Sequence, residues 1–151
     1  MDDIDRALVQ ALRQDARSSW AELGRSVGLS GPSVTERVAR LERDGVVLGY
    51  HAVVDPVALG RSVAALVGVH LSDTSDQDVV TRALEKVEEI EDCWFVAGDE
   101  SFLIKVRVAD VPALESTLSR LRAIRGVART RTTVVLSTKW EGRVAEDPAL
   151  S

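Results

Sequence analysis

The chain has 151 residues, of which 45% are apolar and 28% charged, and its formal net charge is −5. This length fits one or two small domains, and the apolar fraction is sufficient for a packed core. No apolar run approaches the roughly 20 residues of a membrane helix, and the acidic start lacks the basic and apolar segments of a signal peptide. We therefore expect a cytoplasmic protein without a membrane partner.

Two amphipathic helices are predicted within residues 1–28. The first covers residues 2–12, with acidic residues at its start, where the helix dipole favours them. After a polar break at residues 15–17, Ser18 or Ser19 is expected to cap a second helix from Trp20 to Val27. Gly28 is expected to end that helix. The inward residues of the two helices are Ile4, Leu8, Leu12, Leu23 and Val27.

A third helix is predicted between Ser30 and Gly45. Ser30 can cap it with its hydroxyl, and Pro32 is tolerated because amides of the first turn have no partner inside a helix. Gly45 supplies the left-handed residue that commonly ends a helix. The inward face of this helix carries Val34, Val38 and Leu41.

The outward face of the third helix is polar. It offers hydroxyls and guanidiniums, which suit phosphates and guanine edges. Taken alone, such a helix is more often a solvated surface helix, but a short helix, a glycine turn and a longer helix make a helix-turn-helix. We therefore predict a DNA-binding domain over residues 1–50. Its candidate DNA contacts are Ser30, Gly31, Ser33, Thr35, Glu36, Arg37, Arg40 and Arg43.

The charge of this half limits how it can bind DNA. Residues 1–50 hold seven arginines and eight carboxylate side chains, so no general basic field attracts the chain to DNA. Binding must depend on the local arginine cluster of the third helix. Residues 46–56, with apolar side chains and a Gly-Tyr step, are predicted to form a short strand or wing, and residues 51–61 a linker.

The second half predicts a ferredoxin-like β-α-β-β-α-β domain over residues 62–138. We expect a strand over residues 62–71, apolar on both faces and hence covered on both, and a helix over residues 76–89. A hairpin follows, with strands over residues 93–97 and 102–108 and a turn at residues 98–101. Asp110 is expected to cap a second helix that Gly126 ends, before a strand over residues 127–138. The inward helix residues are Val79, Val80, Ala83, Leu84, Val87, Val111, Leu114, Leu118 and Leu121.

Two segments of this half carry charges of opposite sign. Residues 85–92 are acidic and residues 120–126 basic, which suggests either an interlocking surface for self-assembly or two solvated faces. The lone cysteine, Cys93, excludes an internal disulfide, and we expect it to be buried in its strand.

His51 and His70 are too few and too scattered for a metal site. No catalytic triad or phosphate loop is present. We expect no metal, no cofactor and a polar tail over residues 139–151.

The motifs together resemble the Lrp/AsnC (feast/famine) family of transcription regulators over nearly the whole chain. They are Ile4-Asp5, Val27-Gly28-Leu29-Ser30, the run from Arg37 to Leu41, and Gly45-Val46 with Gly49-Tyr50. The resemblance implies an α+β protein with an N-terminal winged helix-turn-helix. It also implies a C-terminal effector-sensing and oligomerising domain, whose sheets pair into homodimers that close into octamers (tetramers of dimers).

The resemblance further implies an amino-acid effector bound between dimers by the hairpin turn and the last strand. The residues concerned are Gly98, Asp99, Glu100, Ser101, Phe102, Thr132, Thr133 and Val134. A glycine turn exposes amides, Asp99 can accept from an ammonium, and the threonines offer hydroxyls to a carboxylate. Without the resemblance, these residues are an ordinary hairpin turn and β-forming threonines.

The chain departs from the family pattern at both sites. Ser101 and Phe102 stand where many members carry Asp and an aromatic such as Tyr, so Asp99 or Glu100 replaces the usual ammonium contact, or the effector differs. Glu36 and Ala39 stand where basic residues are frequent, which predicts a shallower salt dependence of DNA binding. Glu36 could accept from a cytosine amine, but we favour an ion pair with Arg40.

The sequence leaves two other functions open. One is an architectural DNA-binding protein without a ligand, against which the net acidity argues mildly. The other is an enzyme similar to the sirohaem decarboxylases, which resemble this family in both halves. Because those enzymes use histidine among other polar residues and this chain has only two, we favour a regulator over an enzyme.

Overall fold

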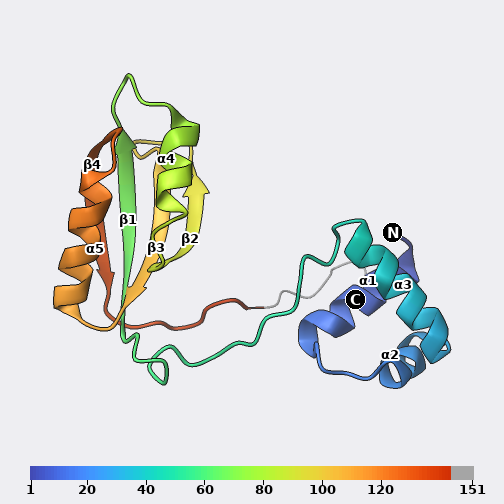
Figure 1. Ribbon diagram of the computed structural model, residues 1–151. Helices are drawn as coiled ribbons and strands as arrows, with labels where there is room; N and C mark the ends of the chain where they lie inside the picture. The colour runs from blue at the N-terminus through green and yellow to red at the C-terminus, as the bar shows by residue number, and fades with distance from the viewer. Residues whose placement is uncertain (144–151) are drawn as a thin grey trace. The chain divides into compact units, whose positions relative to one another are not determined.

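The computed structural model describes residues 1–143, and these form two compact units (Figure 1). The first unit contains residues 1–53, to which residues 140–143 are assigned, and the second contains residues 54–139. The first unit consists of helices, and the second consists of a four-stranded sheet with two helices. Most of the predicted tail, residues 144–151, lies outside the described residues.

Three helices make the first unit: α1 (Asp3–Gln14), α2 (Trp20–Val27) and α3 (Gly31–Arg43). Each begins at a capping side chain, because the first amides of a helix have no partner within it. Asp2 and Ser19 form capping boxes with residues three positions on, and Ser30 accepts from the Ser33 amide. The core of this unit consists of Leu8, Leu12, Leu23, Val34 and Val38.

Two glycines shape the turn between α2 and α3. Gly28 has φ +71°, a left-handed conformation that glycine adopts without strain. Gly24 faces the turn, and the Leu29 amide donates to its carbonyl oxygen at 2.8 Å. A Cβ on Gly24 would lie closer than 3.0 Å to the Leu29 carbonyl oxygen. The absence of a side chain at Gly24 therefore allows α3 to start close to α2.

The predicted wing is not formed. Gly45, with φ +69°, ends α3, and the amides of Val46 and Val47 donate to the Leu41 carbonyl. Residues 46–56, all of them described, contain no strand. The apolar pattern there predicts a strand, but among the described residues of this unit no second extended segment offers a ladder of hydrogen bonds. The Tyr50 hydroxyl instead donates to a Glu42 carboxylate oxygen at 2.8 Å.

The second unit has the predicted β-α-β-β-α-β order. Its elements are β1 (Val63–Leu71), α4 (Gln77–Leu84), β2 (Ile90–Phe95), β3 (Phe102–Val108), α5 (Val111–Ala123) and β4 (Val127–Val135). The strands are ordered β2-β3-β1-β4, and every pair is antiparallel. Both helices lie over one face of the sheet (Figure 1).

The core of this unit lies between the sheet and the two helices. The register pairs Val67 with Ile104, and these alternate residues of β1 and β3 face the helices. As predicted, the alternating apolar residues of β3 are all buried on this face. The core residues are Ala65, Val67, Val69, Val80, Leu84, Phe102, Ile104, Val106, Val108, Leu114 and Leu121.

Several predicted helix and strand limits were wrong. The helix α4 ends at Leu84 rather than near residue 89, β2 starts at Ile90 rather than Cys93, and β4 ends at Val135. Val79 and Val111 were expected to face inward but are 45% and 67% exposed. An eight-residue helix buries one stripe, and Val80 and Leu84 already provide it in α4.

Among the described residues, no helix or strand of the same unit covers the second face of the sheet. On β1, Leu66 pairs with Lys105 and Thr133 and is 37% exposed, and on β2 Trp94 is 47% exposed. The other alternate residues of β1 on this face, Ala64, Gly68 and His70, are buried, so the prediction that both faces of the first strand are covered is wrong only at Leu66 within a single chain. The prediction of a buried Cys93 was also wrong, since this side chain is exposed near the sheet edge.

Candidate functional site

The start of α3 presents the hydroxyl groups predicted for DNA contact. The Ser30 and Ser33 hydroxyls lie 2.8 Å apart, and the Thr35 hydroxyl donates to the Gly31 carbonyl at 3.0 Å. Ser30 and Thr35 are exposed, whereas Gly31 and Ser33 are half-buried. The capping bonds orient these groups on the surface without removing them from solvent.

The arginines of α3 are not equivalent. Arg37 Nη1 contacts carboxylate oxygens of Asp2 at 2.7 Å and Asp5 at 2.8 Å. Arg40 Nη2 contacts both Asp5 oxygens, at 3.1 and 3.0 Å. The expected pair between Glu36 and Arg40 is therefore absent, because Asp5 on α1 takes its place. Neither Glu36 nor Arg43 forms an ion pair within the described residues.

Asp5 is the centre of this four-residue cluster. Its side chain is only 2% exposed. Burial raises the pKa of the Asp5 carboxyl, but the Asp2 amide and the Arg37 guanidinium outweigh burial and bring that pKa below its ordinary value. The hydrogen bond from Arg37 likewise lowers the pKa of Asp2. Both carboxylates are therefore charged at neutral pH, and their formal charges balance those of the two guanidiniums.

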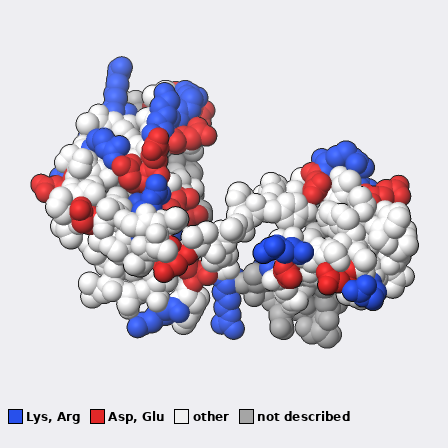
Figure 2. Space-filling view, turned by 60° about the horizontal axis from the view of Figure 1, so that its bottom comes forward, with Lys and Arg blue, Asp and Glu red and all other residues white. Residues whose placement is uncertain are grey.

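The surface around this helix carries both signs of charge. A hollow of about 370 Å³ is lined by Leu29, Ser33, Glu36, Arg37, Arg40 and Arg43. Figure 2 shows basic and acidic side chains interspersed on the visible face of each unit. The site can receive phosphate groups at Arg40 and Arg43, but it has no extended basic field.

The predicted effector residues of the hairpin are held in different ways. A Glu100 oxygen contacts Arg131 Nη2 at 2.7 Å, and the Glu100 side chain lies directly over Gly68 of β1. Ser101 is tied to β1, since its amide donates to the Val69 carbonyl at 2.9 Å. Gly98 and Asp99 are exposed at the turn.

The remaining predicted effector residues divide between the two faces of the sheet. Phe102 is buried in the core, with its ring edge-on to Phe95 at 5.3 Å between centroids. Thr132 pairs with Val67 and Thr133 with Leu66, so the two threonines point to opposite faces, and Val134 shares the face of Thr132. Glu100 and Thr133 therefore share the open face, and one chain alone does not gather all eight residues around one cavity.

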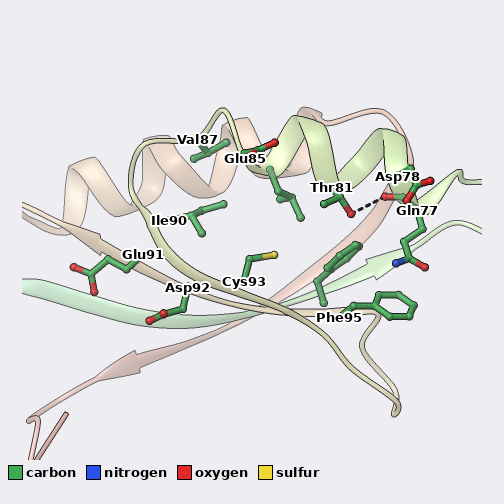
Figure 3. A pocket seen from close by; sticks show the side chains of 12 residues that line it. Gln77, Asp78, Thr81, Glu85, Val87, Ile90, Glu91, Asp92, Cys93 and Phe95 are labelled. Atoms are coloured by element: carbon green, nitrogen blue, oxygen red, sulfur yellow. Dashed lines mark hydrogen bonds between the residues drawn. The ribbon is translucent and has the colours of Figure 1, made fainter. Parts of the chain in front are cut away.

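A groove between α4 and β2 was not predicted. It has a volume of about 520 Å³ (Figure 3). Its lining includes Asp78 of α4, Glu85 directly after that helix, and apolar side chains such as Val87 and Ile90. Cys93 points into it, and although this residue is exposed overall, the partial removal of water around its thiol in the groove raises the pKa of that thiol. Its lining comes from residues 77–95, which are α4, the loop after it and β2, and from Phe102 of β3, and the packing of the helix on the sheet creates the groove.

The acidic and basic helix ends noted in the sequence partly neutralise each other within one chain. Arg120 of α5 forms an ion pair with Glu89, which follows α4. Glu91 contacts Lys105 at 2.7 Å and Arg107 at 2.9 Å. This pairing reduces the charge available for an interlocking surface between copies.

Among residues 1–143, no helix combines the length and the apolar content that crossing a membrane requires. The same range holds no group of three or more His, Cys, Asp or Glu side chains arranged to bind a metal ion.

Known proteins match the chain in both units. The model of the AsnC-type helix-turn-helix domain matches residues 1–42, and that of the Lrp/AsnC ligand binding domain matches residues 64–145. The HTH-type transcriptional regulator LrpA of Mycobacterium tuberculosis is 45% identical over 143 residues, which cover 95% of each chain. The leucine-responsive regulatory protein of Escherichia coli is 40% identical and is matched over 85% of its length by 90% of this chain.

Solved structures show the same similarity in three dimensions. The crystal structure of M. tuberculosis LrpA superposes with a TM-score of 0.88 at 44% identity, over 96% of this chain and 99% of that one. A feast or famine regulatory protein from M. tuberculosis, complexed with L-methionine, gives a TM-score of 0.90 at 44% identity, over 95% and 97% of the two chains.

Proposed function

The chain belongs to the Lrp/AsnC family of transcriptional regulators, and on this premise we propose which surfaces of its two units carry the function. The helix α3 contacts double-stranded DNA, and the second unit binds an amino acid and joins copies of the chain. The observation that carries this proposal is the exposed polar face of α3 on a helix-turn-helix unit. The similar proteins are regulators and not enzymes, so the decarboxylase alternative is set aside.

Arg43 is the free guanidinium of the α3 surface. If it contacts a phosphate, Arg43→Ala weakens binding to all duplexes and reduces the slope of log K against log salt by about 1. The assay is a titration of a labelled duplex, selected by the wild type from a random pool, at several salt concentrations. Arg82→Ala on α4 is the matched control, since it removes the same charge from the other unit. An unchanged slope in Arg43→Ala would exclude the phosphate contact.

The effector is proposed to be an amino acid. The similarity to a protein complexed with L-methionine supports this class, and exposed Asp99 offers a carboxylate for the ammonium. Thermal unfolding with each of the common amino acids at ~1 mM tests it. A ligand at about 100 times its Kd stabilises the native state by about 2.7 kcal/mol, which raises Tm by several degrees.

A substitution at Asp99 tests whether this residue contacts the effector. Asp99→Ala should abolish the shift in Tm while leaving the ligand-free Tm unchanged, because Asp99 lies in an exposed turn. Asp73→Ala, in another exposed loop of the same unit, is the control. A normal shift in Asp99→Ala would remove Asp99 from the site, and no shift with any amino acid in the wild type would exclude this class of effector.

Assembly is proposed to use the open face of the sheet. Leu66 and Trp94 give it apolar contacts that no described residue of the same unit covers. We propose a homodimer through this face and, from dimers, an octamer in the cytoplasm. An effector that prefers one assembly shifts the population toward it, and avidity of the joined recognition helices amplifies the change. Sedimentation of Leu66→Glu tests this, since a charge on the face should leave a monomer. An unchanged mass would exclude the face.

A further inference from the structure

The ion-pair cluster between α1 and α3 has a consequence for DNA recognition. It joins Asp2 and Asp5 at the start of α1 to two of the three arginines of α3. Asp5 is the one member that touches both arginines, and it is the most deeply buried of the four. The orientation of both guanidiniums therefore depends on one carboxylate from a different helix.

The same cluster leaves part of Arg40 available. Only its Nη2 atom takes part in the bonds to Asp5, and the Arg40 side chain remains 47% exposed. A guanidinium has five N–H donors in a rigid plane, so fixing one end fixes the direction of the others. Arg40 thus presents its remaining donors from the side of α3 that faces α1.

The position of these arginines around α3 separates them from the outermost face. Residues seven apart lie on nearly the same side of a helix, so Glu36 and Arg43 share one direction. Arg37 and Arg40 lie between that direction and the buried face of Val34 and Val38. In a helix-turn-helix, contacts beside the recognition helix reach the DNA backbone, and contacts from its outer face reach bases.

We propose that Asp5 is a positioning residue for DNA recognition. Its buried carboxylate holds Arg40, with Arg37, so that Arg40 contacts a phosphate at a fixed place, and reading of bases is left to Thr35 and Glu36, nearer the start of the helix. Phosphate contacts of this kind set the register of a protein on the duplex. Asp5 therefore contributes to specificity without touching DNA. This inference rests on the proposed binding of DNA by α3.

The substitution Asp5→Asn tests the proposal through two duplexes, one selected by the wild type from a random pool and one of scrambled sequence. The freed guanidiniums should steepen the salt dependence on the scrambled duplex by about 0.9 in log–log slope, as one added phosphate contact would. The preference for the selected duplex should fall about tenfold, which is the size of one lost base contact. A purely structural loss would weaken both duplexes in parallel.

Asp3→Asn is the matched control. It removes the same charge from the same turn of α1, and Asp3 makes no ion pair with α3 in the described residues. Its preference for the selected duplex should equal that of the wild type. A preference in Asp5→Asn that matches the value in Asp3→Asn would overturn the proposal.

Arg40→Gln keeps the test decisive even if Asp5→Asn destabilises the first unit, which circular dichroism would reveal. Arg40→Gln should weaken both duplexes, because phosphates are present in any sequence, and it should also lower the preference for the selected duplex, because the contact that sets the register is lost. In the Arg40→Gln background, Asp5→Asn should lower the preference for the selected duplex by a smaller factor than it does in the wild type. If Arg40→Gln instead abolishes the preference and spares the scrambled duplex, Arg40 reads a base and the proposal is wrong. If the wild type binds neither duplex, the proposed function itself fails.

Discussion

The close approach of α2 to the turn before α3 predicts a large effect of adding one methyl group at Gly24. In Gly24→Ala the new Cβ would lie closer than 3.0 Å to the Leu29 carbonyl oxygen, and 3.4 and 3.5 Å from the carbonyl carbons of Leu29 and Ser30. These are backbone atoms, and the bond from the Leu29 amide to the Gly24 carbonyl limits their movement.

The expected loss follows from two opposing effects. Alanine in a helix interior gains about 1 kcal/mol over glycine, whereas overpacking costs about 1–3 kcal/mol. Because a backbone group is in the way, we take the upper value, which leaves a net loss of about 2 kcal/mol. For a unit of this size, that loss lowers Tm by about 10 °C.

Gly31→Ala is the matched control for this prediction. A Cβ on Gly31 would meet its nearest atoms at 3.9 and 4.0 Å, which is ordinary contact. We expect this variant to stay within about 0.5 kcal/mol of the wild type. Urea unfolding followed by the helical circular dichroism signal measures both variants. Equal stability of Gly24→Ala and Gly31→Ala would refute the reasoning.

Burial, together with the bond to Glu42, raises the pKa of Tyr50 to about 12, and this only tyrosine can be titrated by its absorbance. Its stabilisation is complete below the unfolded value of 10 and is lost as pH rises toward 12; Glu42→Gln should lower the midpoint, and an unchanged one would exclude the bond. Burial raises the pKa of Glu91, but the ion pairs of Glu91 with β3 bring this pKa below the ordinary 4.5. The stability that these pairs provide is therefore present above pH 4.5 and is lost as the pH falls below it. Urea unfolding should show less acid sensitivity in Glu91→Gln, and equal sensitivity would contradict this. Phe102→Ala should lose about 3–5 kcal/mol in urea unfolding, whereas a loss under about 1 kcal/mol would place the ring outside the core.

Local signals in the sequence were sufficient for most of the secondary structure. Ser30 and Gly45 bound α3 as predicted, because a cap acts on amides within three residues and a left-handed glycine acts at one position. The alternation from Phe102 to Val108 placed β3 correctly, since a strand with one buried face repeats every second residue. The β-α-β-β-α-β order of these elements was then sufficient to predict the ferredoxin-like unit.

Other features depended on residues that are distant in sequence. The capping box of Asp2 and Asp5 is visible in the sequence, but their pairing with Arg37 and Arg40 links positions 32 to 35 residues apart. The packing of α1 against α3 decides that pairing, and so the local preference of Arg40 for Glu36 is overridden. The prediction of a wing over residues 46–56 was wrong for a related reason, since a strand is stable only where another strand pairs with it.

The sequence by itself determined the family, the order of the elements and the kinds of side chain at each candidate site. Only the tertiary structure decided which of these side chains meet. It joined two arginines of α3 to a buried carboxylate, and it placed Thr132 and Thr133 on opposite faces of one strand. It also left Leu66 exposed on a face that the apolar pattern had assigned to a core. The physical reason is that periodicity reports which residues avoid water, whereas the partner that covers or neutralises them depends on how distant segments pack.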